Sequence, residues 1–242
     1  EKAGKQGMKA YLKAQAAKMG VPMTDAQADA FCAYHDRLTA ANREMNLTSV
    51  GEDAQEAVDR NYLDSLTILP FLDGVSTLID VGTGAGFPGV PVAIMRPDIH
   101  VTLMDALGKR VAFLKEVVAA LGLNADCVHA RCEDAAKKPE FRDAYDVACA
   151  RAVAETNVLS EWMLPFVKPG GRMLALKGPM AAEEAARAQA ALSQLNGRLA
   201  RVCPVSVPGR DWDHRVIEIL KTGATPDRFP RRAGIAEKRP LK

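Results

Sequence analysis

Aromatic residues make up only 5% of this 242-residue chain, and its five cysteines form no Cys-x-x-Cys pair. The shortage of aromatics leaves no obvious stacking platform for single-stranded nucleic acid. The odd cysteine count and the spacing argue against a disulfide framework and against a zinc site. No apolar run approaches the ~18 residues of a membrane-spanning helix, and the net charge is only +2. Any nucleic-acid contact must therefore come from a local cluster of cations.

The composition is that of a globular chain. Hydrophobic residues make up 48% and charged residues 26%, and this length suffices to bury a core as one domain, alone or with an extension. The N-terminal residues lack the apolar stretch of a signal peptide. We therefore expect a reduced, soluble, cytoplasmic protein. The sequence predicts no membrane association, no metal ion and no protein partner.

Residues 1–72 predict a helical extension, with capping-box patterns at Thr24–Gln27 and Ser49–Glu52. From 73 to 222, short apolar runs alternate with helical segments of about 10 to 15 residues, which is typical of βαβ units and a mainly parallel sheet. Seven runs are expected as strands. The last two have no helix between them and should pair antiparallel at one edge. Residues 223–242 form a basic, irregular tail.

The stretch "DVGTGAGFPG", residues 80–89, follows the first predicted strand. In an open α/β sheet this turn faces the ligand, because glycines let the backbone approach closely and a helix begins there. One interpretation is a dinucleotide site, since three glycines fit G-x-G-x-x-G and acidic Asp105 follows about 20 residues later. That match leaves out Gly82 and places Pro88 inside the motif, so it is weak evidence for NAD.

The other interpretation is S-adenosylmethionine, for which the pattern D-x-G-x-G-x-G places Gly82 and Gly84 beneath the cofactor. Asp105 ends the second strand, where a carboxylate can accept both ribose hydroxyls. Glu133 follows the third strand, where adenine would lie. Polar groups at successive strand ends favour this interpretation over NAD and over a glycine turn that serves packing alone.

Several segments together resemble the RsmG (GidB) family of bacterial small-subunit rRNA guanine-N7 methyltransferases. They are "NLTSV", "YLDSL", "DVGTGAGFPGVPVAI", "TLMDALGKRVAFLKEV", "ARAVAE", "ALKG", "DHRVIEI" and "FPRRAGIAEKRPL". The resemblance implies a class I, Rossmann-like methyltransferase fold with a helical N-terminal extension. It also implies S-adenosylmethionine as cofactor and 16S rRNA or a small-subunit particle as partner, the target being N7 of the guanine at position 527.

By the same resemblance, the cofactor contacts fall on residues of the loop and of the strand ends: Gly82, Phe87, Asp105, Cys132, Glu133 and Arg151. The glycine pattern adds Gly84. Two positions depart from the family pattern. Ala106 replaces the usual serine, and Cys132 stands where small or aliphatic residues are common. Neither departure removes a charged contact.

Five further residues are candidates for contact with RNA. Lys177 closes the fifth strand, His214 and Arg215 precede the last strand, and Arg231 and Arg232 lie in the basic tail. For each a bland alternative exists: a solvated lysine at a strand end, a structural histidine, or a tail whose charges face water.

No catalytic acid or base is predicted. Guanine N7 already carries a free lone pair at neutral pH, so attack on a methyl group requires alignment rather than proton removal. The chain has neither a [DNS]-P-P-[FYW] motif nor a Pro-Cys pair after the fourth strand, which methylation of an amine or a pyrimidine carbon would favour. The remaining alternatives are a non-catalytic RNA-binding factor on this scaffold and a small-molecule methyltransferase.

Overall fold

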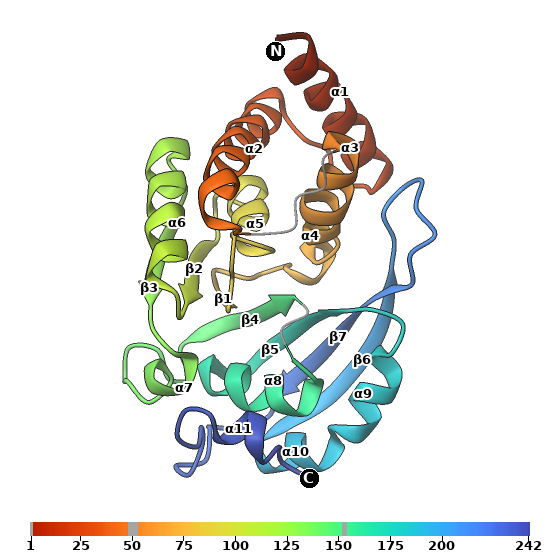
Figure 1. Ribbon diagram of the computed structural model, residues 1–242. Helices are drawn as coiled ribbons and strands as arrows, with labels where there is room; N and C mark the ends of the chain where they lie inside the picture. Colours follow the sequence, from red (N-terminus) through yellow and green to blue (C-terminus); the bar gives the residue numbers. More distant parts are fainter. Residues whose placement is uncertain (1, 48–52, 152–153) are drawn as a thin grey trace.

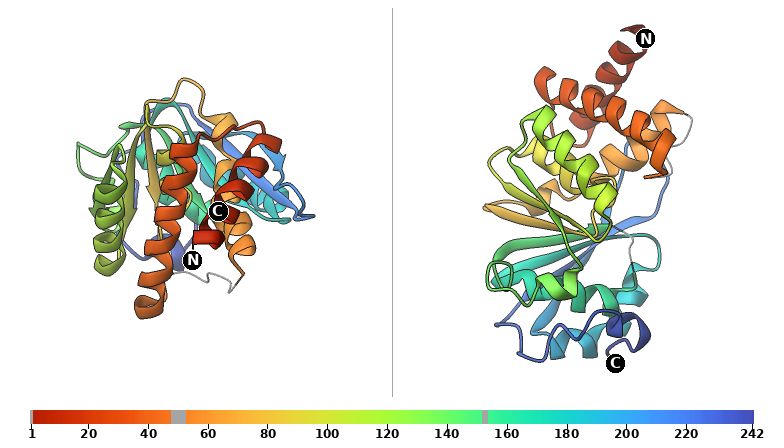
Figure 2. Two further views of the ribbon diagram at one scale, coloured as in Figure 1. Left: turned by 90° about the horizontal axis from the view of Figure 1, so that it is seen from above. Right: turned by 60° about the vertical axis from the view of Figure 1, so that its left-hand side comes forward.

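A seven-stranded sheet lies between two layers of helices (Figures 1 and 2) in the computed structural model, which describes residues 2–47, 53–151 and 154–242. Its strands are β1 (Thr77–Val81), β2 (His100–Asp105), β3 (Ala125–His129), β4 (Tyr145–Arg151), β5 (Val167–Lys177), β6 (Gly197–Val205) and β7 (His214–Lys221). The spatial order is β3-β2-β1-β4-β5-β7-β6, with β1 to β5 parallel. This confirms the predicted mainly parallel α/β sheet. The strand order reverses between β1 and β4, where such sheets bind ligands.

The last two strands pair antiparallel as expected, but the strand that opposes the others is not at the edge. β7 lies between β5 and β6 and is antiparallel to both. The burial of the two strands explains the order. Most of β7 is buried, as an interior strand requires, whereas β6 has exposed side chains along its length and suits an edge.

One face of the sheet carries the N-terminal helices and the first crossover helices: α1 (Lys2–Lys18), α2 (Asp25–Met45), α5 (Gly89–Met95) and α6 (Gly108–Leu121). Between α2 and β1 the chain forms α3 (Ala54–Ala57), the π-helical turn η1 (Val58–Leu63), α4 (Asp64–Leu66) and the 3-10 turn η2 (Leu69–Phe71). The capping box at Thr24 is confirmed, since Gln27 N donates to Thr24 Oγ1 at 3.1 Å and Thr24 N to Gln27 Oε1 at 2.9 Å. The second predicted capping box falls on residues outside those described.

The opposite face carries α7 (Cys132–Ala135), α8 (Thr156–Met163), the 3-10 turn η3 (Leu164–Phe166), α9 (Ala181–Arg187), α10 (Gln189–Gln194) and α11 (Ile235–Lys238). The alanine-rich stretch 181–194 divides at Ala188 into α9 and α10. No helix among the described residues is both long and apolar enough to span a membrane.

The helical extension shares a core with the sheet layer. Phe31, Tyr34 and Leu38 line one face of α2 at helical spacing and are fully buried in the cluster that also holds Val90 of α5 and Leu114 of α6. The extension is therefore packed onto the sheet and its crossover helices as one body. The division at residues 72 and 222 stays a prediction.

The C-terminal segment is packed rather than solvated. Phe229 is buried on the α8 face of the sheet. Arg142 donates to the carbonyl oxygens of Thr225, Pro226 and Phe229 at 2.8–3.2 Å. Lys221, which is completely buried, leads into this segment. These contacts fix the direction of the last residues.

Lys221 anchors that segment through its ammonium group, which donates to Asp143 Oδ1 at 2.9 Å and to Thr225 Oγ1 at 2.7 Å. The carbonyl oxygens of Leu164 and Val167 accept at 2.6 and 2.8 Å. We expect Lys221→Ala to lower the free energy of unfolding by about 3–5 kcal/mol, because Asp143 and two carbonyls lose their partner. Urea unfolding measures the change. Lys238→Ala, an exposed control, should change it by less than about 0.5 kcal/mol, and equal effects of the two substitutions would contradict the anchor.

Candidate functional site

Two cavities open at the carboxyl ends of the parallel strands. The first, which we call the loop cavity, has a volume of about 280 Å³ and lies beyond β1, β2 and β3. The second, the basic cavity, has a volume of about 380 Å³ and lies beyond β4 and β5, beside the start of β7. The strand order places the two cavities side by side across the switch point between β1 and β4.

The carboxyl group of Asp80 fixes the conformation of the glycine loop through hydrogen bonds. Its Oδ2 accepts from Thr83 Oγ1 at 2.7 Å and from Gly89 N at 2.8 Å, which ties the loop to the first residue of α5. Gly86 adopts φ +111°, and a Cβ there would lie 2.6 Å from Val90 Cγ2. Glycine is therefore required at that position by both conformation and space.

Asp105 connects the glycine loop to the end of β2. Its Oδ2 accepts from Gly84 N and its Oδ1 from Leu107 N, both at 2.9 Å. Arg110 lies 3.7 Å from Oδ2. The carboxylate also lines the loop cavity with Gly82, so the structure brings together the predicted ribose contact and the first loop glycine.

Cys132 and Glu133 begin α7 at the far side of the loop cavity and both line it. The Cys132 thiol donates to Glu133 Oε1 at 3.2 Å. Burial raises the pKa of this thiol, and the neighbouring carboxylate raises it further, so Cys132 stays protonated at neutral pH. Cys132 is thus a packing and hydrogen-bonding group of the cavity wall rather than a nucleophile.

Phe87 and Arg151 form a contact outside the loop cavity. Phe87 is buried and packs against Tyr34 and Tyr62, with ring centroids 5.8 and 5.9 Å away. The Arg151 guanidinium carbon lies 4.9 Å from the centre of the Phe87 ring. The Phe87 ring therefore packs against the Arg151 guanidinium. Arg151 lines the basic cavity instead of the loop cavity. A direct cofactor contact of either residue stays a prediction.

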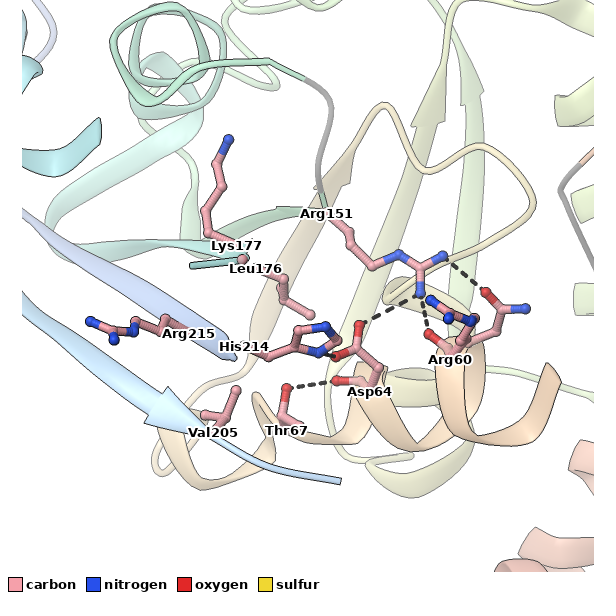
Figure 3. A pocket seen from close by; sticks show the side chains of 11 residues that line it. Arg60, Asp64, Thr67, Arg151, Leu176, Lys177, Val205, His214 and Arg215 are labelled. Carbon is pink, nitrogen blue, oxygen red and sulfur yellow. Dashed lines mark hydrogen bonds and ion pairs between the residues drawn. The ribbon is translucent and has the colours of Figure 1, made fainter. Parts of the chain in front are cut away.

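The basic cavity is organised by Asp64, which α4 presents beside the carboxyl ends of the strands (Figure 3). Its Oδ1 lies 2.8 Å from His214 Nδ1, and its Oδ2 lies 3.7 Å from Arg151 Nη1. Arg151 also donates to the carbonyl of Arg60 at 2.9 Å and to Asn61 Oδ1 at 3.1 Å, both in the π-helical turn. The hydrogen bond to Asp64 raises the pKa of His214, which favours the imidazolium form.

Two predicted RNA contacts meet different surroundings in this cavity. Lys177 forms an ion pair with Glu184 at 3.0 Å, donates to the carbonyl of Ala154, and has only 8% of its side chain exposed. Its charge is compensated by Glu184 in this structure, and contact of Lys177 with an RNA phosphate stays a prediction. Arg215 is partly exposed, and its one ion pair among the described residues is with the exposed carboxylate of Asp213 at 3.0 Å, so its charge stays accessible.

The two predicted RNA contacts in the tail, Arg231 and Arg232, also have different surroundings. Arg231 is bound to Glu161 of α8 by several hydrogen bonds of 2.6–3.0 Å. Glu161 is only 1% exposed, so the pair neutralises Arg231 in this structure, and contact of Arg231 with RNA stays a prediction. The sequence did not reveal this partner because Glu161 lies 70 residues away. Arg232 is exposed and stays a candidate.

Sequence reasoning missed three groups that shape the cavities. Asp64 lies inside the quoted segment "YLDSL", but its pairing with His214 spans 150 residues. Trp162 and Gly234 line the loop cavity from α8 and from the tail. An apolar helix face and an irregular tail carry no local signal for such a role.

The Asp80 carboxyl gives a pH-dependent prediction. Burial raises its pKa from 3.8 to about 7, and its Oδ1 has no hydrogen-bond partner among the described residues. The folded protein therefore retains a proton that the unfolded chain releases near pH 4, so this group makes the free energy of unfolding fall as pH rises from about 4 to 7. The total contribution is about 4 kcal/mol.

Asp80→Asn mimics the protonated carboxyl and should remove this contribution. Chemical denaturation at several pH values measures it, as the difference between the unfolding free energies of wild type and variant. The variant should gain stability relative to wild type between pH 4 and 7. Parallel stability curves for the two proteins would show that Asp80 is ionised in the folded state.

The comparisons with known proteins agree with the geometry. The family model for rRNA small subunit methyltransferase G matches residues 27–210. Ribosomal RNA small subunit methyltransferase G of Clostridium perfringens (strain 13 / Type A) is 42% identical over 234 residues, which cover 96% of this chain and 98% of that protein.

Two solved structures show the fold alone. An O-methyltransferase from Bacillus cereus in complex with SAH has a TM-score of 0.56 at 12% identity, covering 90% of this chain and all of that one. A [4+2]-cyclase has a TM-score of 0.55 at 18% identity, covering 82% and 97%. The fold is thus compatible with more than one reaction, and the sequence relatives decide the family. The chain belongs to the rRNA small subunit methyltransferase G family.

Proposed function

We propose that this chain transfers a methyl group from S-adenosylmethionine to N7 of the guanine at position 527 of 16S rRNA. The observation that carries the proposal is the pair of adjacent cavities: one holds the carboxylates of Asp105 and Glu133, and the other is lined by arginines. Family membership supports the reaction class and the rRNA substrate. The substrate we propose is 16S rRNA, either free or within a small-subunit particle.

The residues of the loop cavity fit the adenosine half of the cofactor. Asp105 and Glu133 present carboxylate oxygens, which accept from ribose hydroxyls and from an exocyclic amine. The indole Nε1 of Trp162, another lining residue, is buried without a hydrogen-bond partner among the described residues. A nucleoside offers ring-nitrogen acceptors for such a donor. NAD carries a pyrophosphate, which the carboxylates of Asp105 and Glu133 would repel, whereas S-adenosylmethionine carries none. The lining of the loop cavity therefore favours S-adenosylmethionine over NAD.

The basic cavity supports a mechanism of alignment. When bound, S-adenosylmethionine supplies an electrophilic methyl group. The protein has to hold guanine N7 in line with that group and exclude water, because the nucleophile carries no proton. His214 is ion-paired to Asp64 and its pKa is raised. It therefore acts as a cation that orients RNA instead of a base that removes a proton.

Localisation follows from the substrate rather than from the fold. Ribosomal RNA is assembled and modified in the bacterial cytoplasm, and we place the protein there.

The first test is cofactor binding. Asp105→Asn keeps the size of the side chain but removes the charge that strengthens hydrogen bonds from the ribose. We expect a loss of about 2–4 kcal/mol in affinity for S-adenosylhomocysteine by calorimetry, with no binding of NAD to wild type. Unchanged affinity in the variant would remove Asp105 from the cofactor site.

The second test is the pH dependence of the chemical step. With RNA and cofactor saturating, the single-turnover rate should not rise between about pH 6.5 and 8.5, because no enzyme group has to lose a proton. A rate that climbs tenfold per pH unit would require a general base. It would also contradict N7 as the nucleophile.

The third test concerns RNA contact at the basic cavity. Arg215→Ala should weaken rRNA binding and reduce the slope of log affinity against log salt by about 0.7 to 0.9, the effect of one lost phosphate contact. Lys168→Ala is the control, since Lys168 lies at the opposite end of β5 and pairs with Asp146. If the two variants show the same slope as wild type, Arg215 makes no phosphate contact.

A further inference from the structure

The C-terminal segment reaches the loop cavity, although none of the cofactor contacts expected from the sequence lies in it. Gly234 and Glu237 line this cavity together with the ends of β1, β2 and β3. Gly234 N donates to Glu133 Oε2 at 3.0 Å. Glu133 thus lies between the cavity and the tail and contacts both.

Arg231 ties the last part of the tail to α8. The Arg231 guanidinium binds both carboxylate oxygens of Glu161, with Nη2 to Oε1 at 2.6 Å and Nε to Oε2 at 3.0 Å. Nη2 also donates to the carbonyl of Arg239 at 2.8 Å. The two ends of the segment 231–239 are thereby brought together, and Gly234 and Glu237 lie within the loop so formed.

The partner of Arg231 stands next in the sequence to a residue of the cavity wall. Glu161 is followed directly by Trp162, which lines the loop cavity, and both belong to α8. α11 packs beside α8 in the structure (Figure 1). Glu161 is buried, and its hydrogen bonds among the described residues go to Arg231, so this pair fixes the position and direction of the tail relative to the cavity.

We propose that residues 231–239 form a wall of the cofactor site at its adenine end, and that the Arg231–Glu161 pair positions this wall. The proposal rests on the proposed function, because it takes the loop cavity to hold S-adenosylmethionine. Arg231 is then a positioning residue for the cofactor. Glu133 has two tasks: it faces the ligand and it holds the backbone of the tail.

The direct test removes most of the wall and keeps the Arg231–Glu161 pair. A chain that ends at Arg232 loses Gly234, Glu237 and α11 but retains buried Phe229 and the Arg231–Glu161 pair. We expect its dissociation constants for S-adenosylhomocysteine and for adenosine to rise by about tenfold or more, since both ligands share the adenine end. The thermal midpoint without ligand should change little, which separates this effect from unfolding.

Two substitutions refine the test in the full chain. Arg231→Ala should weaken binding of S-adenosylhomocysteine, whereas Lys242→Ala removes an exposed charge from the tail outside residues 231–239 and should leave it unchanged. KM for S-adenosylmethionine should rise in the shortened chain while KM for rRNA stays level. Equal affinity for S-adenosylhomocysteine in the shortened chain and in wild type overturns the proposal.

The same measurements separate this proposal from the function itself. If wild type binds neither S-adenosylmethionine nor S-adenosylhomocysteine, the proposed function fails. If wild type binds them and the shortened chain binds equally well, only the role of the tail is wrong. Protection of the tail from trypsin at Arg232 and Lys238 by S-adenosylhomocysteine, but not by NAD, would support the wall independently of activity.

Discussion

The interaction on which the functional end of the molecule depends is the placement of Asp64 between two cations. Its carboxylate holds His214 from β7 on one oxygen and approaches Arg151 from β4 with the other. These two strands belong to the sheet, whereas Asp64 belongs to the helical extension. One carboxylate therefore fixes how the extension meets the carboxyl ends of the strands, and its 7% exposure limits competition from water.

The helical segment that carries Asp64 is unusual in its geometry. It contains a π-helical turn, η1, and the carbonyl of Arg60 in this turn accepts from Arg151. Asn61 in the same turn accepts from the other arm of the guanidinium. Arg151 also packs on the Phe87 ring. The ring and the two acceptors of the turn together fix the orientation of its guanidinium. A reaction that needs only alignment is served by cations held in this way.

Much of this could be predicted from the sequence, because the signals were local. The glycine loop, Asp105 and Glu133 stand directly after apolar strands, and parallel strands bring their carboxyl ends to one edge. The position of β7 inside the sheet, the pair of Arg231 with Glu161 and the ion pair of Lys177 were not predicted. Each depends on a partner chosen by three-dimensional packing, and a lone arginine or lysine looks the same in sequence whether it faces water or a buried carboxylate.

The central claim is that the loop cavity holds the cofactor while the basic cavity aligns the RNA. Asp64→Asn tests this claim most directly. The substitution keeps the shape of the side chain and removes the charge that holds Arg151 and His214. The single-turnover rate of methyl transfer to 16S rRNA should fall by about 10- to 100-fold, the equivalent of one lost charge-assisted interaction. Affinity for S-adenosylhomocysteine should stay at the wild-type value. An unchanged rate, or a loss of cofactor affinity that accounts for the whole decrease, would contradict the account.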